Sequence, residues 1–292
     1  MLIFYVLLFN WWRLKMAEDK RPLFLFDVDE TLVGTDNLFN TTAFPEAVRR
    51  AQAQGWLVGL NSDAPVIRLA ERAREWGLDG PIVAELGSII VPNPHDLTPI
   101  WQDIRHMGVF NKIRGEFLQR GLAEHPDAIF TLSDKEEVLL ALENMTPETV
   151  KSWVILHGLR QHSLAFYAYK VGPRGIAFDL PRLKSLAGLA AHLFEQTTRK
   201  NPLIDVNDDY GICIIHEPRA SKRKAVRALK ENFGQIVMVG NSMSDFLNSP
   251  TIVQCAVYNA HQELKKRSDY VAISPLTTGA IECLDWALAT LK

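Results

Sequence analysis

The order of hydrophobic and polar residues predicts alternating strands and helices in the first third of the chain. Residues 23–28 form a continuous apolar run, which is typical of a strand buried on both faces of a sheet. Residues 45–54 have helical spacing, and Gly55 follows them as a C-terminal cap would. The pattern continues with strands at 56–60 and 81–84 and a helix at 64–76. This alternation predicts βαβ units and a parallel sheet.

The pattern changes after residue 91 and returns towards the end of the chain. The middle region predicts helices at 109–120 and 183–196, and strands at 164–171 and 176–180 joined by a turn. The last region predicts strands at 212–215, 236–239, 255–257 and 270–273 and helices at 222–233 and 278–291. We therefore predict a doubly wound parallel α/β core, formed by residues 22–91 and 212–292, and an inserted α+β domain at 92–211.

Composition limits the possible functions. The chain has 292 residues, long enough for a main domain and a smaller one, and 47% of them are hydrophobic. A net charge of -2 gives no sign of a nucleic-acid partner. Three widely spaced cysteines, each in an apolar run, predict buried thiols in a reduced compartment, and so a cytoplasmic protein. The sequence does not indicate an oligomeric state.

Residues 1–21 read as an N-terminal extension. The apolar stretch at 1–9 is shorter than the roughly 20 residues that span a bilayer. Positive charge follows it rather than precedes it, unlike in a signal peptide. One interpretation makes Met16 the natural start and residues 1–15 an added segment. The alternative is an interfacial anchor with Trp11 and Trp12 at the headgroups. No membrane partner is expected.

The segment Asp27-Val28-Asp29-Glu30-Thr31 comes directly after the first predicted strand. Two carboxylates beside a buried strand cost free energy unless they are paired or bind a metal. Phosphoryl transfer needs a nucleophilic oxygen and a general acid near the leaving group. Asp27 as nucleophile and Asp29 as acid and base would meet this need. A surface turn rich in aspartate is the alternative.

Three further segments place polar side chains at strand ends or helix starts. Asn61 and Ser62 could hold a phosphoryl oxygen, although Asn-Ser-Asp is also common turn chemistry. Lys222, near a helix start, could neutralise the phosphate, whereas most lysines are solvated surface charges. The segment from Gly240 to Asp245 offers the hard oxygen ligands that suit Mg²⁺.

These motifs together resemble the haloacid dehalogenase (HAD) superfamily of phosphatases, within it the Cof-type group with a C2-type cap. The resemblance implies a Rossmann-like core over about 22–91 and 212–290, with the insert as cap. It also implies that Asp27 is the nucleophile, Asp29 the acid/base, Lys222 the conserved lysine, and Asn61 or Ser62 the phosphate ligand. Its other matches are Ala84-Glu85-Leu86-Gly87 and Asn259-Ala260 with the segment that follows.

The sequence departs from the family pattern at three places. In the fourth motif, Asn241 stands where the family has a metal-binding aspartate and Ser244 replaces an asparagine. Leu60-Asn61-Ser62-Asp63 stands where the Cof-type group usually has Thr-Gly-Arg, and Leu86 replaces an asparagine near the third strand. We therefore expect Mg²⁺ to bind Asp27, the Asp29 carbonyl and at least one of Asn241 and Asp245. An asparagine carbonyl can bind Mg²⁺ but brings no charge, so we expect weaker metal binding or a larger role for Asp245.

The resulting expectation is a Mg²⁺-dependent phosphatase that acts on small phosphorylated metabolites, with sugar phosphates implied by the resemblance, through an aspartyl-phosphate. A phosphomutase with the same chemistry is one alternative, and a catalytically weak phospho-ligand-binding protein is another. The candidate substrate contacts all lie in the insert: His157, His162, Tyr167, Lys170 and Arg174.

Overall fold

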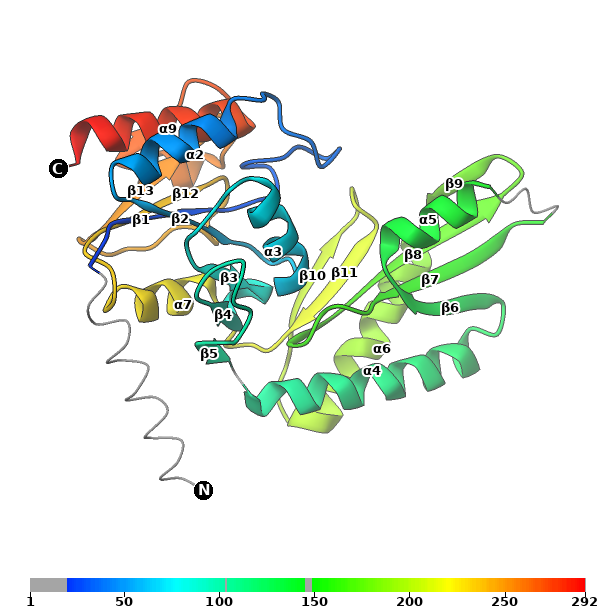
Figure 1. Ribbon diagram of the computed structural model, residues 1–292. Helices are drawn as coiled ribbons and strands as arrows, with labels where there is room; N and C mark the ends of the chain where they lie inside the picture. The colour runs from blue at the N-terminus through cyan, green and yellow to red at the C-terminus, as the bar shows by residue number, and fades with distance from the viewer. Residues whose placement is uncertain (1–19, 103, 145–148, 292) are drawn as a thin grey trace. The chain divides into compact units, whose positions relative to one another are not determined.

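The computed structural model describes residues 20–102, 104–144 and 149–291. The interpretations of residues 1–15 therefore lie outside the described residues. Contacts divide the chain into two compact units. We call residues 20–102 with 221–291 the core unit, and 104–220 the insert unit (Figure 1). No helix in these ranges has the length and apolar character needed to cross a membrane.

The core unit is built on a mostly parallel sheet. Within the described residues its order is β14-β13-β12-β1-β2-β3-β4-β5, and all pairs from β14 to β3 are parallel. The short strands beyond β3 run antiparallel. The bounds are β1 Leu23–Phe26, β2 Leu57–Asn61, β3 Ile82–Ala84, β4 Ile89–Val91, β5 Trp101–Gln102, β12 Ile236–Gly240, β13 Ile252–Ala256 and β14 Tyr270–Val271.

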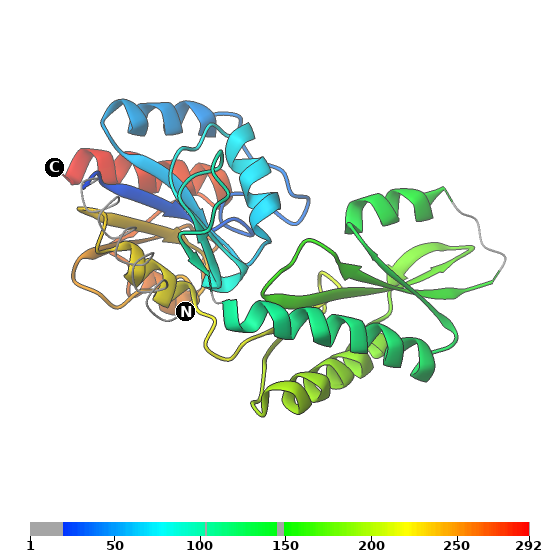
Figure 2. The ribbon, with the colours of Figure 1, turned by 60° about the horizontal axis from the view of Figure 1, so that its bottom comes forward.

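Helices cover both faces of this sheet because its strands are apolar on both sides. In β1, Phe24 and Phe26 face one hydrophobic cluster while Leu23 and Leu25 face another. The first cluster includes α2 (Phe44–Ala53), α3 (Val66–Glu75) and α9 (Leu276–Thr290), and the second includes α7 (Lys222–Leu229). The short helices are η1 (Glu85–Gly87) and α8 (Gln262–Lys265). Figure 2 shows α7 on the opposite side of the sheet from α2 and α9.

The insert unit is an α+β domain with its own sheet. The strand order is β10-β11-β8-β7-β6, with β9 paired to β8, and β6 with β7 is the parallel pair. Helices α4 (Ile104–Glu124) and α6 (Leu180–Thr198) pack on one face, and α5 (Lys135–Glu143) packs on the other. The strands are β6 Ala128–Ser133, β7 Lys151–His157, β8 Ser163–Gly172, β9 Gly175–Phe178, β10 Leu203–Asn207 and β11 Ile212–His216.

Two boundaries differ from the sequence-based assignment. The strand predicted at 212–215, which we expected in the core, is β11 (Ile212–His216); it pairs antiparallel with β8 and β10 and belongs to the insert sheet. It does so because a turn closed by Gly211, with φ of 59°, folds it back on β10 as a hairpin. At the other junction, β5 extends the core sheet to Gln102, beyond the expected limit at residue 91.

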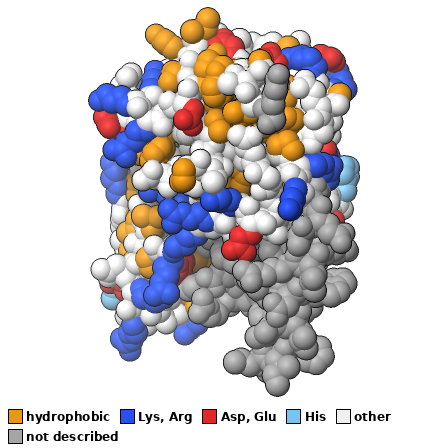
Figure 3. Space-filling model, turned by 90° about the vertical axis from the view of Figure 1, so that its left-hand side faces the viewer, with side chains coloured by type: hydrophobic (Ala, Val, Ile, Leu, Met, Phe, Trp, Pro, Cys, Tyr) orange, Lys and Arg blue, Asp and Glu red, His pale blue; other side chains and the backbone are white. Residues whose placement is uncertain are grey.

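The three cysteines of the chain are free and buried, as their apolar surroundings predicted. Figure 3 shows one face of the molecule, on which lysine and arginine side chains are scattered rather than gathered into one continuous patch.

Candidate active site

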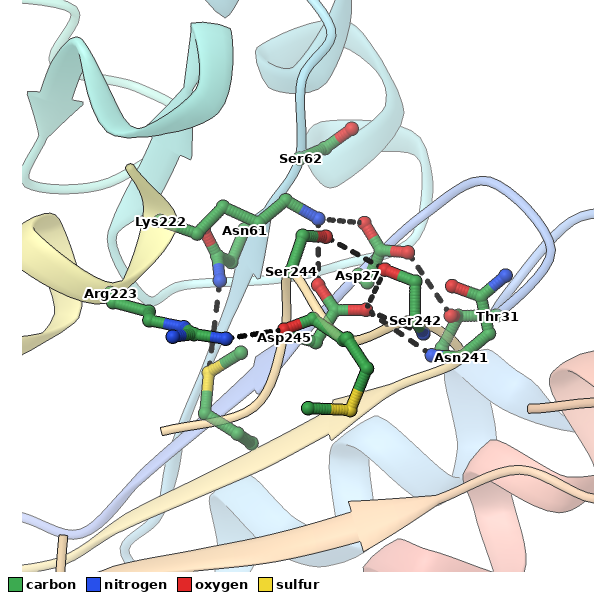
Figure 4. Close-up of polar contacts among 12 residues, drawn as sticks. Asp27, Thr31, Asn61, Ser62, Lys222, Arg223, Asn241, Ser242, Ser244 and Asp245 are labelled. Atoms are coloured by element: carbon green, nitrogen blue, oxygen red, sulfur yellow. Dashed lines mark hydrogen bonds and ion pairs between the residues drawn. The ribbon is translucent and has the colours of Figure 1, made fainter. Parts of the chain in front are cut away.

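Three neighbouring parallel strands of the core bring predicted site residues to one edge of the sheet. Asp27 follows β1, Ser62 follows β2 and Asn241 follows β12, and these strands are adjacent in the order β12-β1-β2. Figure 4 shows their side chains together with Lys222 from the start of α7. They lie at the carboxyl edge of the sheet, where doubly wound folds hold reactive groups.

Lys222 lies between two buried carboxylates. Its Nζ donates to Oδ1 of Asp27 at 2.6 Å and to Oδ1 of Asp245 at 2.7 Å. None of the three residues is more than 6% exposed. Each bond is therefore shielded from water and stronger than an ion pair on the surface. Loss of Lys222 would leave two buried carboxylates without their shared cation.

Burial controls the protonation of this group. Desolvation, and then the negative charge of Asp245, raises the pKa of Asp27 to about 7, although Lys222 opposes the shift. Burial also opposes the charge of Lys222, but the carboxylates of Asp245 and Asp27 outweigh it and raise its pKa. Without a bound cation, Asp27 is therefore partly protonated at neutral pH while Lys222 is charged. A cation beside Asp27 would favour its ionised form.

A turn much earlier in the chain determines where α7 begins. Glu85, Leu86 and Gly87 all have left-handed backbone angles, with φ of 46°, 55° and 83°. A Cβ on Gly87 would lie 2.5 Å from the carbonyl oxygen of Ser221, the residue before Lys222. Glycine alone permits so close an approach of the two backbones. The Ala84-Glu85-Leu86-Gly87 segment therefore supports the helix start that carries the lysine.

The loop after β1 gives the two aspartates different surroundings. Thr31 Oγ1 donates to Oδ2 of Asp27 at 3.2 Å, so both oxygens of that carboxylate accept a bond. Asp29 is exposed, and its Oδ1 lies 4.0 Å from Nη1 of Arg72 on α3. Arg72 also donates to the side chain of Asn37 at 2.8 Å. Thr31 and Arg72 were not among the predicted site residues, although the place of Thr31 in the Asp27-Val28-Asp29-Glu30-Thr31 segment could have indicated it.

The two candidate phosphate ligands at the end of β2, Asn61 and Ser62, point their side chains in different directions (Figure 4). Asn61 is fully buried, and its Nδ2 donates to the sulfur of Met238 at 3.8 Å. Figure 4 shows this amide pointing away from the Asp27 carboxylate. Ser62 Oγ accepts from the backbone N–H of Ala64 at 3.2 Å, in the turn before α3. The Ser62 side chain therefore contacts the turn before α3, whereas the Asn61 side chain contacts the buried Met238.

Asp245 closes the loop after β12. Its Oδ2 accepts from the backbone N–H groups of Asn241 at 3.3 Å and Ser242 at 3.1 Å, and from the Ser242 hydroxyl at 3.2 Å. Its side chain lies against Gly240, where a Cβ would come within 2.5 Å. Since Oδ1 binds Lys222, both oxygens of Asp245 are engaged inside the protein. Asn241 stands half-buried beside this loop.

Oxygen atoms suitable for Mg²⁺ are present at this edge. Among the described residues, no three His, Cys, Asp or Glu side chains cluster so that they could hold a metal ion. Mg²⁺ needs only one or two carboxylates and takes carbonyl, water and phosphate oxygens as its other ligands. Asp27, the Asn241 amide and the Asp29 carbonyl could provide such a set. Once Asp27 is ionised, two buried carboxylates against one ammonium also leave a negative charge that a cation would balance.

The five candidate substrate contacts lie in the insert unit and are not grouped at one point. His157 ends β7 and His162 precedes β8, so these two flank one turn. Lys135 Nζ lies 5.1 Å from the ring centre of Tyr167. The remaining two are near β9: Lys170 pairs with Asp179 at 3.6 Å, and Arg174 is exposed in the turn between β8 and β9.

Comparisons with known proteins identify the fold. No protein-family model matches the chain. A phosphoglycolate phosphatase of Staphylothermus marinus is 24% identical over 269 residues, 89% of this chain and 94% of that protein. A haloacid dehalogenase-like hydrolase from Bacteroides thetaiotaomicron superposes with a TM-score of 0.62 at 16% identity, over 91% of this chain and 99% of that one.

A haloacid dehalogenase subclass IIB sugar phosphatase superposes with a TM-score of 0.55 at 15% identity, over 91% of this chain and 98% of that one. The chain therefore has the fold of the haloacid dehalogenase-like hydrolases. The predicted fold class is confirmed.

Proposed function

We propose that this protein is a magnesium-dependent phosphatase that hydrolyses small phosphomonoesters through an aspartyl-phosphate on Asp27. The observation that carries the proposal is the buried 2.6 Å contact between Lys222 and Asp27. An ammonium in this place orients the carboxylate and can offset the charge of an incoming phosphoryl group. The similarity to proteins named as phosphatases supports the same class of reaction.

The first step transfers the phosphoryl group to the protein. A carboxylate oxygen of Asp27 attacks phosphorus, the bond from phosphorus to the ester oxygen breaks, and Asp29 gives its proton to the leaving alcohol. Thr31 and Lys222 each hold one oxygen of Asp27 and so keep the carboxylate in a fixed orientation. The exposure of Asp29 suits a group that must meet a leaving group arriving from solvent.

The second step returns the enzyme to its starting state. Asp29 takes a proton from water, the water oxygen attacks phosphorus, and the acyl-phosphate bond breaks to release inorganic phosphate. Mg²⁺, held by Asp27, the Asp29 carbonyl and Asn241, would supply positive charge that stabilises the phosphoryl oxygens. In this proposal Asp245 holds Lys222 and the loop after β12, in addition to any part in binding the metal.

Of the two candidate phosphate ligands, Ser62 is the one we favour. Its hydroxyl and the neighbouring backbone N–H groups stand where the chain turns into α3, a common arrangement for holding phosphate oxygens. Asn61 is directed towards Met238. Mutation of Ser62 should therefore weaken phosphate binding more than mutation of Asn61.

We further propose that the substrates are small phosphorylated metabolites in the cytoplasm, sugar phosphates or phosphorylated hydroxy acids, and that the insert unit acts as the cap that selects them. The sugar phosphatase and the phosphoglycolate phosphatase among the similar proteins support this range. The neutral Asn241 favours the rival of a weakly catalytic phospho-ligand-binding protein, because it removes a charge that the family pattern supplies.

Phosphate release from a panel of sugar phosphates and phosphoglycolate, with Mg²⁺ and with a chelator, tests the proposal. Wild type should release phosphate only with Mg²⁺, whereas a phosphomutase would yield an isomer and a binding protein neither product. Asp27→Asn keeps the size of the side chain and removes the nucleophile. Retention of more than about a hundredth of the wild-type rate, equivalent to about 2.7 kcal/mol, would refute the role of Asp27.

A further inference from the structure

One side-chain amide connects the loop after Asp29 to the C-terminal part of the core unit. Nδ2 of Asn259 donates to the carbonyl oxygen of Glu30 at 2.7 Å, and its Oδ1 accepts from the backbone N–H of Leu276 at 3.1 Å. Glu30 and Leu276 both have left-handed backbone angles, with φ of 60° and 52°. Residues other than glycine keep this conformation only where surrounding contacts enforce it. Asn259 provides such a contact to both.

Glu30 is held on both sides. Its N–H donates to the carbonyl oxygen of Val33 at 2.8 Å, and its own carbonyl accepts from Asn259. These bonds fix the peptide groups before and after Glu30. Asp29 precedes this residue, and Thr31, whose hydroxyl bonds the nucleophile, follows it. A change of backbone angle at Glu30 would therefore displace the proposed acid and base.

A second asparagine holds the same loop at its far end. Nδ2 of Asn40 donates to the carbonyl oxygen of Pro275 at 3.1 Å, and its Oδ1 accepts from the backbone N–H of Thr278 at 3.0 Å. Like Asn259, it is exposed, and it binds the residues around the start of α9. It lies next to α2, however, and not beside Glu30. Asn40 is therefore a matched control for Asn259.

We propose that Asn259 is a positioning residue, which keeps Glu30 in its left-handed conformation and so directs Asp29 towards the leaving group. The inference rests on the proposed function, in which Asp29 protonates the leaving alcohol. An alkyl phosphate depends on that proton. An aryl phosphate such as p-nitrophenyl phosphate depends on it much less, because its leaving group is stable as an anion. A displaced Asp29 should slow the two substrates unequally.

Asn259→Asp removes the donor to Glu30 and keeps the acceptor for Leu276. With saturating Mg²⁺, kcat for glycerol phosphate should fall about tenfold, as for the loss of one hydrogen bond of about 1.4 kcal/mol. The rate with p-nitrophenyl phosphate should change by less than about twofold. Asn40→Asp makes the same chemical change at the other end of the loop. Asn40→Asp should lower Tm by about as much as Asn259→Asp does, and it should leave the rates with both substrates unaltered.

A double variant tests whether the effect passes through Asp29. In an Asp29→Asn background, Asn259→Asp should cause no further loss with glycerol phosphate, because the two changes share one target. An equal loss for both substrates, no loss at all, or a full added loss in the double variant would overturn the inference. So would an unequal loss in Asn40→Asp. Activity that survives Asp27→Asn would instead refute the proposed function on which this inference depends.

Discussion

The raised pKa of Asp27 predicts an unusual dependence of stability on pH. The folded protein holds this proton up to about pH 7, whereas the unfolded chain releases it near the ordinary aspartate pKa of 3.8. The folded state therefore binds more protons between these limits. The contribution of Asp27 to stability is therefore complete below pH 4 and is lost as pH rises towards 7. Asp27→Asn, which cannot ionise, should escape this loss.

The loss of stability is set by the difference between the folded and unfolded pKa of Asp27. A shift from 3.8 to about 7 corresponds to about 4 kcal/mol when the ionised form is fully populated. Part of this stability contribution of Asp27 has already been lost at pH 5. The stability advantage of Asp27→Asn over wild type should therefore grow by about 2–3 kcal/mol between pH 5 and pH 8.

Urea unfolding of the metal-free proteins at several pH values, in the presence of a chelator, measures this difference. Asp29→Asn is the control, because it makes the same change at a side chain that is 59% exposed. Saturating Mg²⁺ should restore wild-type stability above pH 7, since it binds the ionised folded state. A difference between Asp27→Asn and wild type that stays within about 0.5 kcal/mol from pH 5 to 8 would refute the reasoning.

Three shorter predictions follow from the same site. Leu86→Asn should raise the free energy of unfolding by about 0.5–1 kcal/mol, measured with urea, because asparagine tolerates φ of 55° better than leucine does; a fall would contradict this. Lys222→Met should lower that free energy by about 3–5 kcal/mol. Asn241→Asp should reduce the Mg²⁺ concentration for half-maximal activity, and an unchanged requirement would exclude Asn241 as a ligand.

The sequence predicted the core strands well where both faces are buried, because such strands are continuous apolar runs. β1 and β12 are examples, since every residue in each is buried. β10 was missed because all its residues are exposed or half-buried and give no apolar run. Because β10, the hairpin partner of β11, was not predicted, β11 was grouped with the core strands that follow it in the sequence.

The site was predictable in its members more than in its contacts. A parallel sheet brings the carboxyl ends of its strands to one edge, so Asp27 could be expected near at least one of Asn241 and Asp245, while the strand order itself was not predicted. The position of Lys222 between them depends on Gly87 supporting Ser221, a contact between distant parts of the chain that no local pattern reveals. The bond from Asn259 to Glu30 depends in the same way on the whole fold.

If the proposed function holds, the charges at the site explain how an asparagine at position 241 is compatible with catalysis. With Asp27 ionised, two buried carboxylates and one ammonium leave a single negative charge, and partial protonation of Asp27 reduces it before any ligand binds. A second metal-binding carboxylate at position 241 would attract Mg²⁺ more strongly, yet it would also repel the phosphate dianion that must enter beside it. The neutral amide lowers that repulsion. If Mg²⁺ and substrate bind as proposed, this chain therefore relies on the phosphate itself for part of its metal affinity, and the two should bind cooperatively.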